Sequence, residues 1–176
     1  MLKANRWWIS FVVSLLLAPM AEAQVPPQPG PEHERLKKLE GTWDATFMAG
    51  TEESKGTMTS KIQLGGLWLV NDFQGDFAGQ GFTGKGLETY DPAKKKYVSV
   101  WVDSMSTSPM ISEGTFDQDK NVLTMIGEGP GPDGKPTKYK MTTHYKDKDS
   151  FVWTMFGTGP DGEEAPMMSI SYKRRK

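Results

Sequence analysis

The sequence predicts an all-β fold, a closed antiparallel up-and-down barrel of about ten strands preceded by one short helix. From Gly41 onward, apolar and polar residues alternate with a period of two in short runs, which is the pattern of half-buried strands. Clusters of turn-forming residues separate these runs, so consecutive strands are expected to pair as antiparallel hairpins. A meander of this length hides its edges by closing on itself.

The first element expected is a proline-rich, extended leader over Gln24–Pro31. Glu32–Glu40 then contains good helix formers with Leu36 and Leu39 three residues apart, and Gly41 ends this helix. Each later run is bounded by turn residues and is typical of a strand. The expected strands are 41–49, 55–64, 67–76, 81–90, 96–104, 109–116, 121–128, 136–146, 150–157 and 165–174.

Residues 1–23 are typical of a cleavable signal peptide. Lys3 and Arg6 give a basic start, and the apolar run that follows is too short to span a bilayer. Ala21-Glu22-Ala23 supplies the small residues that a signal peptidase requires, so cleavage is expected before Gln24. We therefore expect a periplasmic or secreted protein with one barrel domain over residues 32–176. An uncleaved N-terminal anchor is the alternative.

The composition excludes several classes of function. Without Lys3, Arg6 and Glu22, the chain has 19 basic and 21 acidic residues, a net charge of −2, which does not suit nucleic acid or an anionic membrane surface. There is no cysteine, so thiol chemistry and thiolate metal sites are excluded. The two histidines, His33 and His144, do not form a zinc or haem site with other residues at a suitable spacing, so no metal or cofactor is expected.

The hairpin 82–103 indicates which face of the sheet points inward. Pairing Tyr90 with Tyr97 places two glycines, Gly84 and Gly86, on the same face as Trp101, and a strand glycine often makes room for a large neighbour. The opposite face has lysine, threonine and valine side chains, which suit solvent. The residues expected to face the lumen are Glu88, Tyr90, Tyr97, Trp101 and Asp103, and Val98, Val100 and Val102 are expected outside.

The same alternation applies to three other strands. In strand 136–146, Tyr139 and Met141 are expected to face inward, whereas the lysines and His144 face water. In strand 55–64, the inward residues are expected to be Met58, Ser60, Ile62 and Leu64. In strand 41–49, Trp43, Ala45 and Phe47 share one face.

Gly41-Thr42-Trp43 resembles the Gly-x-Trp start of lipocalins and fatty-acid-binding proteins. The resemblance implies a tryptophan at the closed end of the barrel under an arginine from the last strand, here Arg174 or Arg175. The segments LEGTWDATF, LGGLWLVNDFQG, GLETYDPAKKKYVSVWVDSMST and SEGTFDQDKNVLTM resemble the bacterial family known as domain of unknown function 1579. That resemblance implies a lipocalin-like barrel, often exported, and no established activity.

Two groups of residues are candidates for a site. Asp103 and Glu113 lie on neighbouring strands, with Glu88 close in the expected register, and could act as acid and base or only bind water at a barrel mouth. Large side chains could line a pocket for an apolar or aromatic ligand or fill a core instead. These are Trp68, Trp101, Tyr139, Met141 and Trp153.

These observations favour an exported barrel that binds a small apolar or amphipathic molecule in its lumen, with Asp103 and Glu113 orienting a polar group. A lumen enzyme of isomerase or cyclase type, using the same two carboxylates, is the second hypothesis. A filled barrel that acts as an interaction module in the cell envelope is the third. The sequence does not indicate the oligomeric state.

Overall fold

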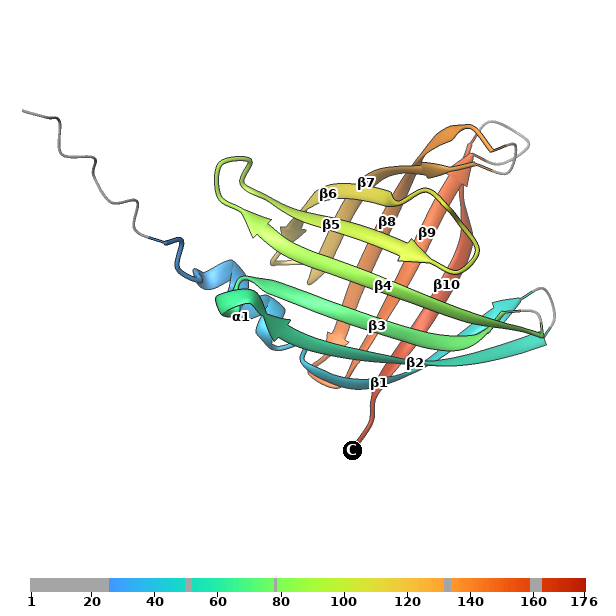
Figure 1. The fold of residues 1–176 in the computed structure, drawn as a ribbon, viewed down its shortest axis with the longest axis horizontal. Coiled ribbons are helices and arrows are strands. Elements are labelled where there is room, and N and C mark those ends of the chain that lie inside the picture. The colour runs from blue at the N-terminus through green and yellow to red at the C-terminus, as the bar shows by residue number, and fades with distance from the viewer. Residues whose placement is uncertain (1–25, 50–51, 78, 132–133, 159–162) are drawn as a thin grey trace, which may run out of the picture.

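A computed structural model shows a closed, ten-stranded antiparallel barrel with one helix at one end (Figure 1). It describes residues 26–49, 52–77, 79–131, 134–158 and 163–176. The expected signal peptide and its cleavage site lie outside the described residues and stay predictions. Within the described ranges, no helix is both long enough and apolar enough to cross a membrane.

The predicted elements are confirmed, with small shifts at their ends. The helix, α1 (Pro31–Lys37), is shorter than expected at its C-terminal side. The strands are β1 (Gly41–Ala49), β2 (Glu52–Gln63), β3 (Trp68–Phe77), β4 (Gln80–Asp91), β5 (Lys96–Asp103), β6 (Met110–Asp117), β7 (Val122–Pro130), β8 (Pro136–Asp147), β9 (Ser150–Thr158) and β10 (Glu164–Arg174).

One expectation for β2 is wrong. Leu64 belongs to a single 3-10 turn, η1 (Leu64–Gly66), between β2 and β3, and its side chain is 66% exposed. Its φ of 50° and that of Gly65, 72°, are incompatible with an extended strand, so the inward alternation stops at Ile62.

Every strand pairs with the next one in sequence, and β1 pairs with β10 to close the barrel. At this closing seam Trp43 lies opposite Arg174, and Phe47 lies opposite Ile170. The turns between β2 and β3, β4 and β5, β6 and β7, and β8 and β9 share one end of the barrel with α1 (Figure 1). We call this the helix end and the opposite end the rim.

Helix α1 covers the helix end. It lies against β2, β3 and β4, and Leu36 is fully buried among barrel residues that include Leu69 and Tyr97. The backbone N–H of Gly30 donates to Nδ1 of His33 (3.0 Å), which fixes the start of the helix. A seven-residue helix has little stability of its own, so this packing holds it in place.

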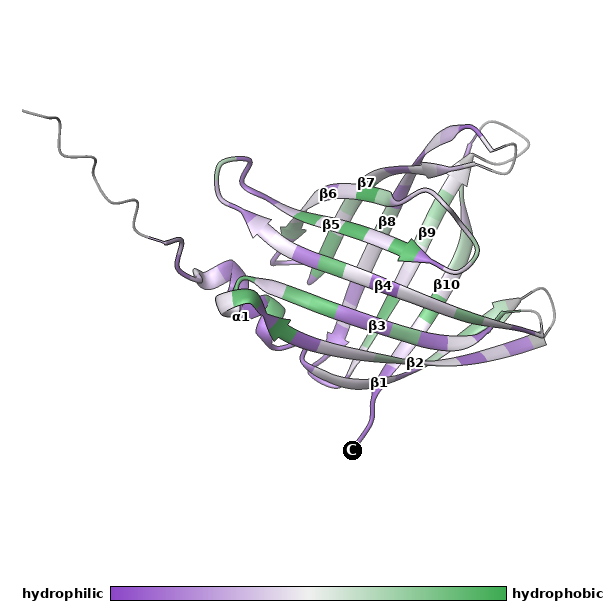
Figure 2. Ribbon diagram, in the orientation of Figure 1, coloured by the Kyte–Doolittle hydropathy of each residue, from purple (hydrophilic) through white to green (hydrophobic). Residues whose placement is uncertain are grey.

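The outer face of β4 to β7 is partly apolar. Leu87, Val102, Ile111 and Ile126 are 40 to 55% exposed, and Val98 and Val100 lie on the same outward face. Figure 2 shows hydrophobic segments on β5 and β6 in this part of the wall. The predicted alternation of β5 is therefore confirmed, with its valines outside and its tryptophan inside.

Candidate functional site

The barrel encloses a cavity of about 830 Å³. Its walls are mostly aromatic, methionine and aliphatic side chains from the inward faces of the strands. The cavity begins beside Leu39 and Leu69 near the helix end and reaches Met105, Ser106 and Pro130 at the rim. A cavity of this size can enclose most of a drug-sized molecule.

Six methionines contribute to this wall. A methionine side chain is flexible and polarisable, so it adapts to ligands of different shape. Together with the phenylalanines they make a surface that suits apolar molecules without fixing one shape. The methionines are Met58, Met105, Met110, Met125, Met141 and Met168.

The predicted register of β4 and β5 is confirmed: Tyr90 pairs with Tyr97, and Gly86 pairs with Trp101. The indole of Trp101 lies against both glycines of β4. A Cβ atom on Gly84 would come within 2.2 Å of the Trp101 ring, and one on Gly86 within 3.3 Å. The two glycines therefore let the indole lie flat along the cavity wall.

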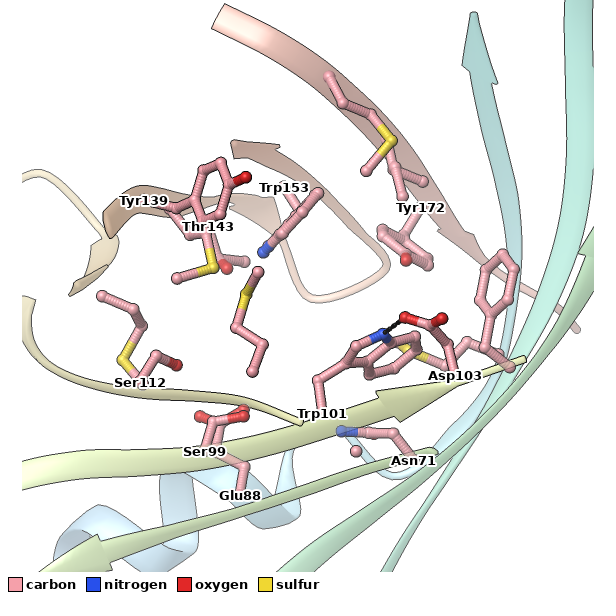
Figure 3. A pocket seen from close by; sticks show the side chains of 18 of the residues that line it. Asn71, Glu88, Ser99, Trp101, Asp103, Ser112, Tyr139, Thr143, Trp153 and Tyr172 are labelled. Atoms are coloured by element: carbon pink, nitrogen blue, oxygen red, sulfur yellow. Dashed lines mark hydrogen bonds between the residues drawn. The ribbon is translucent and has the colours of Figure 1, made fainter. Parts of the chain in front are cut away.

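A polar row crosses the apolar wall near the helix end. Glu88 on β4 pairs with Ser99 on β5, which in turn pairs with Ser112 on β6, and all three side chains line the cavity. Figure 3 shows Glu88 and Ser99 together, with α1 behind them. Next to this row, the Ser60 hydroxyl donates to Oδ1 of Asn71 (2.6 Å), and both residues line the cavity as well.

Asp103 lies toward the rim and is already engaged in hydrogen bonds. Its Oδ2 accepts from Nε1–H of Trp101 (2.9 Å), as the dashed line in Figure 3 marks, and its Oδ1 accepts from the backbone N–H of Met105 (2.9 Å). Asp103 therefore fixes the tryptophan and the start of the β5–β6 turn.

An arginine from α1 lies beneath Glu88. Nη2 of Arg35 is 3.6 Å from Oε1 of Glu88, and its guanidinium lies over the rings of Tyr97, Phe116 and Tyr145, at 4.4, 4.7 and 5.1 Å. The positive charge of the Arg35 guanidinium is therefore stabilised by three aromatic faces and one carboxylate. Nε and Nη2 of Arg35 and Oε1 of Glu88 are buried and have no hydrogen-bond partner among the described residues.

The electrostatics of this pair follow from its burial. Burial raises the pKa of the Glu88 carboxyl, and the Arg35 guanidinium lowers it by less, so the pKa is above its ordinary value. Burial also raises the pKa of Tyr145 to about 12, so its hydroxyl stays neutral at physiological pH. When the Glu88 carboxyl group is ionised, it is the counter-ion of the Arg35 guanidinium.

Five of the predicted ligand-binding residues line the cavity: Glu88, Trp101, Asp103, Tyr139 and Met141. Trp153 lines it too. Tyr90 and Tyr97 have the predicted inward direction but pack at the helix end, where their ring centres are 5.2 Å apart. They support the cavity without lining it.

The predicted place of Glu113 inside the lumen is wrong. In the β5–β6 register Glu113 lies opposite Val98, an outward residue, whereas its neighbours Ser112 and Gly114 point inward. Glu113 instead forms ion pairs with Lys94 and Lys96 on the outer surface, and these hydrogen bonds lower its pKa. It therefore shares no site with Asp103.

Trp68 is also on the outer face. Leu69, its neighbour on β3, is 2% exposed and lines the cavity, so the alternation directs Trp68 away from the lumen.

The residues with a predicted structural role come together at the helix end. The guanidinium over the Trp43 indole is that of Arg174, whereas Arg175 pairs with Asp44. A Cβ atom on Gly41 would come within 2.6 Å of Nη1 of Arg174, so the glycine leaves room for the arginine.

Sequence reasoning placed Ser60 inside but missed the rest of the polar lining and Arg35. Asn71, Ser99 and Ser112 could have been found as site residues by applying the inward alternation to polar residues as well as to apolar ones. Arg35 had no such signal, since a charged residue on a short helix is normally solvated. In the part of the chain that the structure describes, no three metal-ligating side chains come together.

These features define a class of protein, a closed antiparallel barrel with one helix and a mostly apolar internal cavity. The chain belongs to the family described as protein of unknown function (DUF1579), whose model matches residues 28–174. The comparison with curated proteins finds no match.

A solved structure shares the fold. Rv2717c from M. tuberculosis is 14% identical, with a TM-score of 0.62, and the match covers 84% of this chain and 99% of that one. A redesigned β-barrel, mFAP0, solved bound to DFHBI, is 16% identical with a TM-score of 0.43, over 78% of this chain and 99% of that one.

Proposed function

We propose that this protein binds a small apolar or amphipathic molecule in the barrel cavity. The observation that carries the proposal is the cavity of about 830 Å³, lined mainly by apolar side chains and reaching the rim. Apolar surface that is removed from water on binding contributes roughly 25 cal/mol per Å² before the costs of association.

The two other hypotheses have less support. A filled barrel would leave no cavity of this size. An acid–base pair of Asp103 and Glu113 requires both carboxylates on one side of the wall, and they lie on opposite sides. Both carboxylate oxygens of Asp103 also already accept hydrogen bonds, from the Trp101 indole and from the backbone N–H of Met105.

The test is a fluorescence titration with the uncharged fluorophore N-phenylnaphthylamine, which brightens in apolar surroundings. Two neighbouring residues of β6 give a matched pair of variants. Ser112→Phe places a ring inside the cavity, whereas Ile111→Phe places it on the outer face, where Ile111 is 55% exposed. Binding should fall at least about tenfold in Ser112→Phe and stay unchanged in Ile111→Phe.

Absence of binding to the wild-type protein, or equal effects of the two variants, would refute the proposal. Native mass spectrometry of protein purified from its own host is the complementary measurement, because a co-purified adduct would give the mass of the ligand.

We further propose that the protein acts after export. The proposal rests on the basic start, the apolar run and the small residues before Gln24. The mass of the mature chain tests it, since cleavage leaves a protein that starts at Gln24, and an intact chain recovered from the cell would contradict it.

A further inference from the structure

The cavity has two chemically different ends. Between Ser99, at the helix end, and Asp103, at the rim, β5 advances by four residues, or about 13 Å. At the rim, both oxygens of Asp103 accept hydrogen bonds from the protein. At the helix end, the polar atoms around Glu88 are not satisfied in the same way.

We propose that the helix end is a subsite for an uncharged hydrogen-bonding head group, a hydroxyl or a carboxamide, on an otherwise apolar ligand, and that Glu88 and Ser99 bind it. This inference rests on the proposed function, because it specifies which ligand the cavity takes and in which orientation. The ligand enters head first and leaves its apolar part against the methionine and aromatic wall.

The position of Glu88 is the first argument. Its side chain is 16% exposed and lines the cavity, while Oε1 is buried toward Arg35. The exposed part of the carboxyl group therefore faces the cavity, where the rest of the wall is mainly apolar. No hydrogen bond to Glu88 is present among the described residues, so a ligand that donates one to the cavity-facing oxygen gains affinity over a ligand that places an apolar group there.

The neighbouring residues supply complementary groups. Ser99 lies directly opposite Glu88 and Ser112 lies one strand further on, so two hydroxyls continue the polar row on one side of the carboxyl group. Asn71 uses Oδ1 to accept from Ser60, which leaves its amide NH₂ as the donor for the cavity. A hydroxyl or carboxamide both donates and accepts, and can therefore satisfy groups of both kinds.

The charges around the subsite disfavour an ionised head group. Arg35 and Glu88 compensate each other when both are ionised. A ligand carboxylate would meet the charge of Glu88, and a ligand ammonium would meet the charge of Arg35 behind it. Either ion would also lose its hydration in a mostly apolar cavity without gaining an unpaired partner.

The experiment is a competition series against bound N-phenylnaphthylamine with dodecanol, dodecanamide, dodecanoate and dodecylamine at about pH 8, where the acid and the amine are both ionised. These compounds share one alkyl chain length and differ in the head group. Dodecanol and dodecanamide should displace the fluorophore at concentrations at least about tenfold lower than the two ions. Equal displacement by all four, or preference for either ion, would overturn the inference.

Glu88→Gln tests the assignment to Glu88. This variant leaves the Arg35 charge without its carboxylate, so dodecanoate should become a better competitor than dodecanol. Glu113→Gln, which removes the same charge from the outer surface, should keep the wild-type order. A reversal in Asp103→Asn and not in Glu88→Gln would put the head group at the rim and overturn the inference.

Two controls keep the outcomes distinct. If N-phenylnaphthylamine does not bind the wild-type protein, the proposed function fails; if it binds and the head groups compete equally, only the present inference fails. If Glu88→Gln does not fold, Ser99→Ala replaces it and should weaken dodecanol severalfold more than it weakens N-phenylnaphthylamine, which has no hydroxyl group to place in the subsite. Equal effects of Ser99→Ala on both compounds would count against the subsite.

Discussion

The guanidinium carbon of Arg174 lies 4.1 Å from the centre of the Trp43 ring, so a residue near the C-terminal end of the last strand covers a residue of the first. The same guanidinium donates to the carbonyl oxygens of Lys38 (2.8 Å) and Lys148 (3.1 Å). Nε1–H of Trp43 donates to the carbonyl oxygen of Leu39 (3.0 Å). One side chain therefore joins the segment after α1, the β8–β9 turn and the closing seam.

Replacing this arginine should destabilise the barrel. Arg174→Ala removes the stacking on Trp43 and leaves backbone carbonyls without donors, so the free energy of unfolding should fall by about 2–4 kcal/mol. Lys173→Ala changes an exposed neighbour and should have an effect below about 0.5 kcal/mol. Urea denaturation measures both, and equal stability of the two variants would contradict the role of Arg174.

Gly84→Ala should displace the Trp101 indole. The new methyl group would lie 2.2 Å from Cζ2 of that ring, so the indole must move and its hydrogen bond to Asp103 must break or lengthen. We expect a loss of about 1–3 kcal/mol and a shift of tryptophan emission. Gly81→Ala on the same strand meets nothing within 4 Å and should change neither quantity.

The stability of the protein should depend on the ionisation of Glu88. Its pKa is raised by burial, so between its ordinary value and the raised value the folded state binds more protons than the unfolded state. The Glu88 contribution to stability must then fall as pH rises through this window, with a slope of at most about 1.4 kcal/mol per pH unit.

Glu88→Gln provides the reference for that measurement, because glutamine does not titrate. The difference in unfolding free energy, wild type minus variant, should decrease as the pH is raised from acidic to neutral values. The groups that face Glu88 include Arg35, Tyr97 and Tyr145, and the arginine stays protonated throughout. A difference that grows with pH would mean that Arg35 lowers the pKa of Glu88 more than burial raises it.

Glu113→Gln should leave ligand binding unchanged. The carboxylate lies outside the barrel in ion pairs with Lys94 and Lys96, and exposed pairs of this kind contribute little to stability. The measured quantity is the affinity for N-phenylnaphthylamine, which should agree with that of the wild type within about twofold. A large loss would show that this side chain reaches the cavity.

The strands and much of the cavity wall were predictable because alternation along a strand is a local property. Pairing Tyr90 with Tyr97 was sufficient to place Trp101 and Asp103 inside, and the structure has this register. Glu113 was misplaced because closeness on neighbouring strands was considered without the alternation of β6, in which Ser112 is the inward residue. Large apolar size was an equally poor guide at Trp68, whose neighbour Leu69 takes the inward position.

The buried Arg35 was beyond prediction for a different reason. Its environment combines Tyr97, Phe116 and Tyr145, which come from β5, β6 and β8 and meet only when the barrel has closed. Sequence patterns report the neighbours of a residue along one element, whereas the burial of Arg35 depends on the way in which distant elements converge under α1.

The seam between β1 and β10 also affects how the chain can fold. Trp43 and Arg174 pair across the seam although they lie near opposite ends of the barrel sequence. One edge of β1 therefore stays unpaired until the last strand has emerged from the ribosome. Contacts between such distant segments form slowly, since a long loop must close first. Until β10 docks, this edge presents unpaired backbone groups that can pair with another chain.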